Sequence, residues 1–85
     1  MRYGLEFTAS ASRELRSLSR HIQIRVIEKV KALCDDPFPP GVKKLPGEPG
    51  HFRIRIGDYQ VVYRIDGARV IVVIVRVGHR QDVYR

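Results

Sequence analysis

Cysteine is nearly absent from this chain, since Cys34 is the only one among its 85 residues. A lone cysteine excludes an internal disulfide and a zinc site built from several thiolates. Cys34 lies among apolar residues at the end of a helical pattern, which favours a small core residue over a nucleophile.

Acidic residues are also few and dispersed. Of the nine, only Asp35 and Asp36 are adjacent, and they stand where a helical pattern ends. A two-metal nuclease needs several carboxylates that converge on one cleft. The sequence therefore predicts neither a metal site nor another cofactor.

Long hydrophobic runs are missing as well. No apolar stretch approaches the roughly 20 residues that cross a bilayer as a helix, and the beginning of the chain lacks the pattern of a signal peptide. We therefore expect a cytoplasmic protein without a membrane partner. The length, with no second apolar block behind a linker, predicts one domain over residues 1–85, whose small core gives a thin margin of stability.

What the chain has in excess is positive charge. Its 16 lysines and arginines against 9 acids give a formal net charge of +7. This balance predicts nucleic acid or another acidic surface as the partner. Many small basic proteins have no such partner, so the charge has to be combined with the placement of the basic residues.

Residues 51–56 supply that placement, because apolar and basic side chains alternate there with the two-residue period of a strand. Gly57-Asp58 and Asp66-Gly67 are typical of two-residue turns between strands. The second half of the chain is therefore predicted to form a three-stranded antiparallel meander. With two residues in each loop, residue 56 pairs with 59 and residue 65 with 68.

This register predicts two unlike faces of the meander. One face is almost wholly apolar and needs a cover of helices. On the other face Arg55 lies opposite Gln60 and Arg53 opposite Val62, so guanidinium groups flank an apolar centre, a surface suited to a polyanion with flat bases. The second face is predicted to contain His51, Arg53, Arg55, Gln60, Val62, Arg64, Arg69, Ile71, Val73 and Val75.

The first part of the chain predicts an edge strand at residues 3–8 and two helices within residues 11–33, with a break near residues 19–21. Ser10 or Ser12 is expected to cap the first helix, since a serine oxygen accepts from the unpaired amides of the first turn. If the edge strand runs beside a strand that is not its neighbour in sequence, the sheet is mixed.

The second helix is expected to end at Asp35-Asp36-Pro37, because proline disfavours helical geometry in the residue before it. The segment from there to residue 50 is rich in proline and glycine, carries Lys43 and Lys44, and is expected to be a loop. The predicted fold class is α+β: an N-terminal strand, two helices and the meander, with the helices packed on one face.

The order of these elements, the segment DPFPPGVKKLPG and the stretch from GDYQVVYRIDG to HRQDVYR resemble the RelE branch of the RelE/ParE toxin superfamily. The resemblance covers essentially the whole chain. It implies a small RelE-like fold and a bacterial toxin that cuts messenger RNA in the ribosomal A site without a metal. It also implies a cognate antitoxin that silences the toxin in a hetero-oligomer.

The resemblance places the family's two basic strand residues on Arg53 and Arg55. It places a further basic residue on Arg80, after the last strand, and the aromatic residue of the tail on Tyr84. Gln60 departs from the pattern, because many relatives have an arginine there. Glutamine relieves repulsion with Arg55 across the strands and gives up a phosphate clamp.

Cleavage of RNA without a metal uses the neighbouring 2′-hydroxyl as the nucleophile. Guanidinium groups suit the stabilisation of charge on the phosphate, and because they stay protonated they cannot act as bases. Arg53, Arg55 and Arg80 are therefore expected to hold the substrate and stabilise the transition state. Tyr84 is expected to stack on a base or relay a proton.

A histidine is the expected general base, because imidazole exchanges a proton near neutral pH. His51 shares its face with Arg53, and His79 precedes Arg80. His79 is preferred because the family's motif concentrates in the tail. The residues expected to contact RNA around the catalytic group are His51, Gln60, Lys43, Lys44 and Arg64.

Two other functions fit the same residues. A ParE-like toxin would act by binding DNA gyrase and would need no catalytic residues. An attenuated, non-catalytic RNA-binding homologue is also consistent with the missing clamp at Gln60. Arg80 and Tyr84 favour the RNA-cutting branch over the gyrase-binding one.

Overall fold

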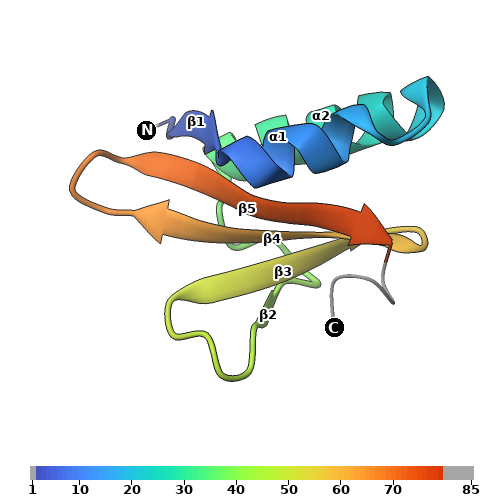
Figure 1. Cartoon of the computed structure of the whole chain (residues 1–85). Coiled ribbons are helices and arrows are strands. Elements are labelled where there is room, and N and C mark those ends of the chain that lie inside the picture. The colour runs from blue at the N-terminus through green and yellow to red at the C-terminus, as the bar shows by residue number, and fades with distance from the viewer. Residues whose placement is uncertain (1, 80–85) are drawn as a thin grey trace.

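The computed structural model describes residues 2–79, in which two helices lie on one face of a five-stranded sheet (Figure 1). None of the helices in this range is long and apolar enough to span a bilayer. In chain order the elements are β1 (Gly4–Phe7), α1 (Ala9–Arg16), α2 (Arg20–Asp35), β2 (Lys43–Lys44), β3 (His51–Ile56), β4 (Tyr59–Asp66) and β5 (Ile71–His79).

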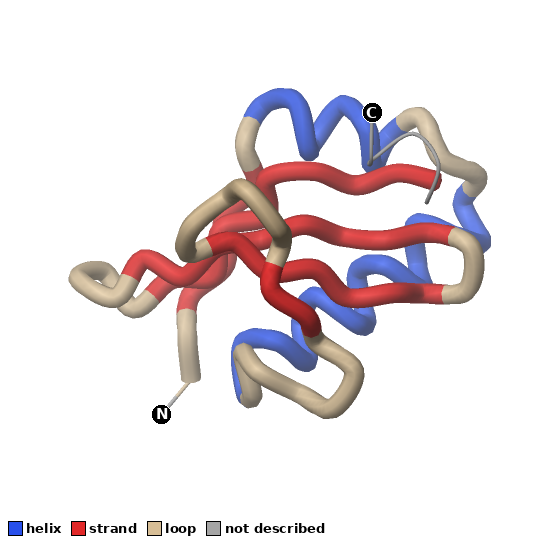
Figure 2. The backbone as a smooth tube through the Cα atoms, turned by 90° about the horizontal axis from the view of Figure 1, so that it is seen from below, coloured by secondary structure: helices blue, strands red, loops and turns tan. Residues whose placement is uncertain are grey.

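The strands follow the order β1-β5-β4-β3-β2 across the sheet. β1 runs parallel to β5, and the other neighbours are antiparallel, so the sheet is mixed. Seen from below in Figure 2, the sheet lies in front of the helices, so neither α1 nor α2 covers its lower face. The predicted α+β class with helices on one face is confirmed.

The segment before β3 was predicted to be a loop, and this was wrong at two positions. Lys43 and Lys44 form β2, which pairs with Arg53 and Phe52 of β3. Their flanking prolines and glycines keep the strand to two residues. β2 thus covers only the first half of the β3 edge.

The start of α1 also differs from the prediction. Thr8, and neither Ser10 nor Ser12, is the N-cap, and its Oγ1 accepts from the Ala11 amide at 3.1 Å. Thr8 follows β1 directly and keeps the extended backbone (φ −67°, ψ 161°) that a capping residue requires, whereas the two serines already lie in the helix. The expected end of α2 at Asp35 is confirmed.

The hairpin between β3 and β4 has the predicted register. Gly57 adopts a φ of 60°, which glycine reaches at little cost. Ile56 therefore pairs with Tyr59, and Arg55 lies opposite Gln60.

The hairpin between β4 and β5 does not have the predicted register. Asp66 pairs with Ile71, so four residues separate the strands and the predicted pairing of residues 65 and 68 was wrong. Asp66 Oδ1 accepts from the Arg69 amide at 3.1 Å, and Val70 turns the chain back with a φ of 55°. Arg69 consequently lies in the turn rather than on the sheet face, where it forms ion pairs with Glu6 and Asp66.

A β-bulge changes the second half of β5. Tyr63 pairs with Ile74, but Val62 pairs with Arg76, so Val75 is the extra residue. Beyond the bulge the alternation of faces is reversed. Val77 therefore joins the core, and Arg76 comes to lie opposite Val62.

The core lies between α2 and the upper face of the sheet. Val26, Val30 and Leu33 of α2 are at most 1% exposed and belong to one cluster with Tyr63. Cys34 is buried beside them, and burial raises the pKa of its thiol above the usual value. This agrees with the expected role of a small core residue.

Tyr63 links the core to the loop after α2, because its hydroxyl donates to the Pro37 carbonyl at 2.6 Å. Burial, with a smaller contribution from the charge of Asp36, raises the pKa of Tyr63 to about 12 from its ordinary value of 10.0. The protonated Tyr63 hydroxyl therefore stabilises the fold fully below pH 10, and this stabilisation is lost as the pH rises from 10 to about 12.

We expect Tyr63→Phe to lower the free energy of unfolding at neutral pH by about 1–2 kcal/mol, because the Pro37 carbonyl loses its donor. The variant should also lose less stability than the wild type between pH 10 and 12. Urea unfolding at several pH values measures both effects, with Tyr59→Phe as a control. Equal alkaline losses in Tyr63→Phe and the wild type would contradict this assignment.

Candidate functional site

The lower face of the sheet carries three rows of residues that the register aligns across β3, β4 and β5. Residues directly opposite each other share a face and have Cβ atoms about 5 Å apart. The rows are His51, Arg64 and Val73; Arg53, Val62 and Arg76; and Arg55, Gln60 and Gly78.

Arg53 and Arg55 form the basic part of this face, as predicted. Arg55 is exposed and Arg53 is half-buried. On the side of β3 away from β4, Lys43 pairs with Arg53 and extends the positive charge to the sheet edge. We call Lys43, Arg53 and Arg55 together the basic row. Lys44 pairs with Phe52 and therefore belongs to the other face.

His51 lies on the lower face, two residues before Arg53. Its Nδ1 is 3.1 Å from the Pro49 carbonyl oxygen. A carbonyl only accepts, so Nδ1 carries the proton and Nε2 of the neutral ring is the acceptor. This tautomer suits a general base that works through Nε2.

His79 lies elsewhere. It pairs with Tyr59, and the two rings meet edge-on with centroids 5.6 Å apart. Because Tyr59 pairs with the core residue Ile56, all three share the helix-covered face. The structure thus does not bring His79 together with Arg53 and Arg55. The bulge in β5 decides this, and the plain alternation of the sequence does not reveal it.

Arg80 and Tyr84, the other two predicted catalytic residues, lie outside the described residues. Within residues 2–79, no three histidine, cysteine or acidic side chains lie close enough to hold a metal ion.

Gln60 is the unusual residue of this face. It lies opposite Arg55 as predicted, but it is 0% exposed, and within the described structure its Oε1 and Nε2 have no hydrogen-bond partner. A buried amide without hydrogen-bond partners lowers the free energy of unfolding by about 1–3 kcal/mol. Because Gln60 is fully buried, it presents no surface to a ligand in this conformation.

Arg76 was missed by the sequence analysis. Its Nη2 lies 3.4 Å from Glu14 Oε2 of α1, and Glu14 Oε1 accepts from the Val77 amide at 2.9 Å. The sequence contained a signal for the bulge, because unbroken alternation from Ile74 would have placed the Arg76 charge in the core. A bulge avoids that cost.

Glu14 thus holds the end of β5 against α1. We expect Glu14→Ala to lower the free energy of unfolding by about 1–3 kcal/mol, because the Val77 amide and Arg76 lose a charged acceptor. Glu14→Gln keeps an acceptor for the amide and should cost less. Urea unfolding of both variants measures the difference, and equal losses would show that the contact with the Val77 amide is unimportant.

Comparison with known proteins places this fold in a family. The family model described as ParE toxin of type II toxin-antitoxin system, parDE, matches residues 5–84. The toxin RelG of Mycobacterium tuberculosis is 38% identical over 86 residues, which cover 100% of this chain and 99% of that protein. The toxin RelE of the same organism is 33% identical over 84 residues, with 98% and 87% covered.

Comparison with solved structures points to the same family. A chain of the toxin-antitoxin complex RelBE2 from Mycobacterium tuberculosis superposes with a TM-score of 0.83 at 38% identity, covering 94% of this chain and 100% of that one. A variant of the Escherichia coli toxin RelE in the free state gives a TM-score of 0.84 at 27% identity, with 99% and 92% covered. This chain therefore belongs to the RelE branch of the RelE/ParE superfamily, the toxins of type II toxin-antitoxin systems.

Proposed function

We propose that this toxin is a metal-independent endoribonuclease that cleaves messenger RNA in the ribosomal A site. The observation that carries the proposal is the basic row on the helix-free face, where Arg53 and Arg55 alternate along β3 with Lys43 beside them. A single strand of RNA meets there two planar, permanently charged groups that each match two phosphate oxygens.

The chemistry assigned to this face is attack of a ribose 2′-hydroxyl on the adjacent phosphate, which forms a 2′,3′-cyclic phosphate while the P–O5′ bond breaks and the leaving 5′-oxygen takes up a proton from water. Arg53 and Arg55 hold the scissile phosphate and stabilise the charge that grows on its oxygens. Arg80 contributes a further positive charge that stabilises the transition state, and Tyr84 stacks on a base or relays a proton. Lys43 and Arg64 contact flanking phosphates.

The proton of the 2′-hydroxyl passes to His51 in this proposal. His51 shares the face of Arg53, and its Nε2 is the accepting nitrogen. His79, which the sequence favoured, lies with Tyr59 on the other face.

We expect His51→Gln to slow cleavage about 10²-fold, since glutamine keeps the size and polarity of the side chain but accepts no proton near neutral pH. Single-turnover cleavage on ribosomes measures the effect, with the exposed His21→Gln on α2 as the matched control. Equal rates for the two variants would remove His51 from the mechanism.

A cognate antitoxin completes the proposal. The complexes RelBE2 and RelBE of Mycobacterium tuberculosis and Escherichia coli pair a toxin with an antitoxin. We propose the same kind of hetero-oligomer for this chain, formed in the cytoplasm where the ribosomes are.

The matching family model is described as a ParE toxin, which favours inhibition of DNA gyrase as the second candidate function. One pair of assays separates the two. Added to translating ribosomes, the toxin should generate new message ends within the codon that occupies the A site, and it should leave gyrase supercoiling unchanged. Gyrase inhibition with intact message would replace the proposal by the second function. Intact message without gyrase inhibition would leave an attenuated RNA-binding homologue.

A further inference from the structure

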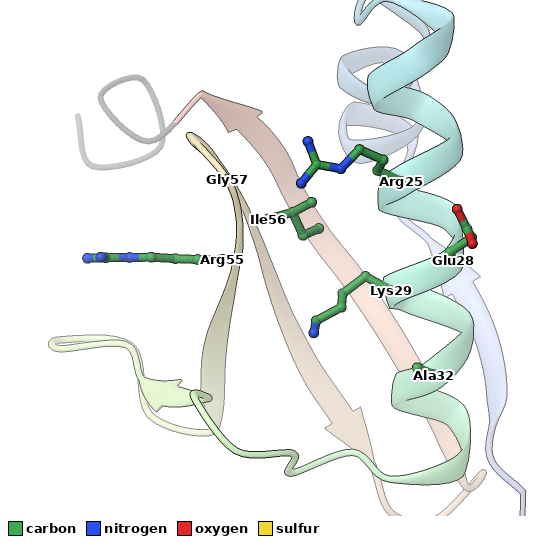
Figure 3. Close-up of a pocket in the computed structure, with 7 residues that line it drawn as sticks. All are labelled: Arg25, Glu28, Lys29, Ala32, Arg55, Ile56 and Gly57. Carbon is green, nitrogen blue, oxygen red and sulfur yellow. The ribbon is translucent and has the colours of Figure 1, made fainter.

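A hollow of about 410 Å³ lies between α2 and the end of β3, and it adjoins the lower face through Arg55 (Figure 3). β2 pairs only with Phe52 and Arg53, so no strand of residues 2–79 lies beside the β3 edge from residue 54 onward. Arg25 and Lys29 of α2 line the hollow on one side, and Arg55 and Gly57 line it on the other.

A second hollow of about 270 Å³ continues along the same edge. It shares Lys29 and Arg55 with the first and adds Lys43 and Arg53. The two hollows together form one track, the β3-edge groove, whose basic residues are Arg25, Lys29, Lys43, Arg53 and Arg55.

The geometry brings these cations to both sides of a single strand. Arg25 and Lys29 are four residues apart on α2, about 6 Å along the helix axis, and Figure 3 shows both extending toward β3. Arg55 extends from β3 away from α2, on the far side of the strand. The groove therefore leads from the helix side of the edge to the lower face of the sheet.

Gly57 ends the groove beside Arg25. A Cβ at this position would meet the two terminal nitrogens of Arg25 at 3.6 and 3.7 Å, which is ordinary contact, so the backbone φ of 60° and not a lack of space favours glycine here.

Arg25 and Lys29 are exposed and form no ion pair with an acid of residues 2–79, where the ion pairs involve Arg2, Arg69 and Arg76. Glu28 is the one acid that lines the first hollow, and in Figure 3 its carboxylate does not extend into the groove. Arg25 and Lys29 lie one helical turn apart on α2, so their exposed charges repel each other, and a polyanion beside them relieves that repulsion.

We infer that the β3-edge groove is a second RNA track, which binds the ribose-phosphate backbone of the strand that enters the lower face. This inference rests on the proposed function. Single-stranded RNA fits better than an acidic peptide, because the groove runs into the face of Arg53 and Arg55, where the proposed cleavage takes place. The apolar residues at its base, Ile54 and Ile56, are only 3% and 7% exposed and leave no pocket for a peptide side chain.

The test compares two double variants with the same loss of charge. Arg25→Gln with Lys29→Gln alters the groove, whereas Arg20→Gln with Lys31→Gln alters another exposed part of α2 that lines a separate hollow. Each full-length protein is titrated with a 2′-O-methyl oligoribonucleotide, which cannot be cut, at several salt concentrations. We expect the log-log salt slope to fall by about 1.4 in the groove variant, from two lost contacts of about 0.7 each, and by much less in the control.

The outcomes separate this inference from the proposed function. Equal slopes for the two variants, with a wild type that cuts message, would overturn the RNA track and leave the nuclease standing. A groove-dependent slope in a wild type that never cuts would support the track and remove the nuclease. If the groove variant loses antitoxin binding while its RNA slope stays that of the wild type, the groove is a protein-binding surface and the inference is wrong.

Discussion

Arg55→Gln is expected to slow cleavage of ribosome-bound message by about 10²- to 10³-fold, the usual loss when one donor to a developing oxyanion is removed. Arg55 is exposed and has no ion pair within residues 2–79, so its substitution should change the free energy of unfolding by less than about 0.5 kcal/mol. Activity and stability therefore separate at this position.

Arg53→Gln is expected to slow cleavage by the same factor as Arg55→Gln. Arg53→Lys should slow it less, because lysine keeps the positive charge but lacks the planar guanidinium group. Arg13→Gln, an exposed position on α1, is the matched control for charge. Single-turnover rates and thermal midpoints are measured for all four variants. A variant at Arg53 or Arg55 that cuts as fast as Arg13→Gln would show that the basic row does not hold the scissile phosphate.

Gln60→Met is expected to raise the free energy of unfolding by about 1–2 kcal/mol. Methionine has nearly the same shape, and it removes a buried amide whose two polar atoms have no partner in the described structure. In a domain of this size the midpoint of thermal unfolding should rise by about 4–8 °C per kcal/mol.

Gln60→Arg should act in the opposite direction. It places a guanidinium group in a fully buried position opposite Arg55, which costs about 3–5 kcal/mol when no anion pairs with it. Bound RNA supplies that anion, so cleavage per folded molecule is expected to rise. A less stable Gln60→Met, or a Gln60→Arg variant that is both slower and more stable, would contradict this account of the site.

The parts of the fold that were predictable depend on neighbours in sequence. The pairing of Arg55 with Gln60 follows from the alternation in β3 and the Gly57 turn, both of which are local. The second hairpin was not predictable from its glycine alone, because the Asp66 side chain closes a longer turn by accepting from the Arg69 amide. The N-cap at Thr8 likewise depends on where β1 ends.

The candidate site divides in the same way. Arg53, Arg55 and His51 were found because one strand's pleat orients all three. The position of His79 depends on a bulge in β5, and that of Arg25 depends on how α2 packs beside β3. The charge of Arg76 marks a break in the alternation of β5, but the position of the bulge and the packing of α2 are decided by contacts between distant segments.

The central claim is that the basic row promotes attack by a ribose 2′-hydroxyl on messenger RNA. The most direct measurement uses translating ribosomes loaded with a message that carries one 2′-deoxy nucleotide at the mapped cleavage position. We predict that this message stays intact while the all-ribose message is cut at the same position. Cutting of both messages at equal rates would contradict the claim.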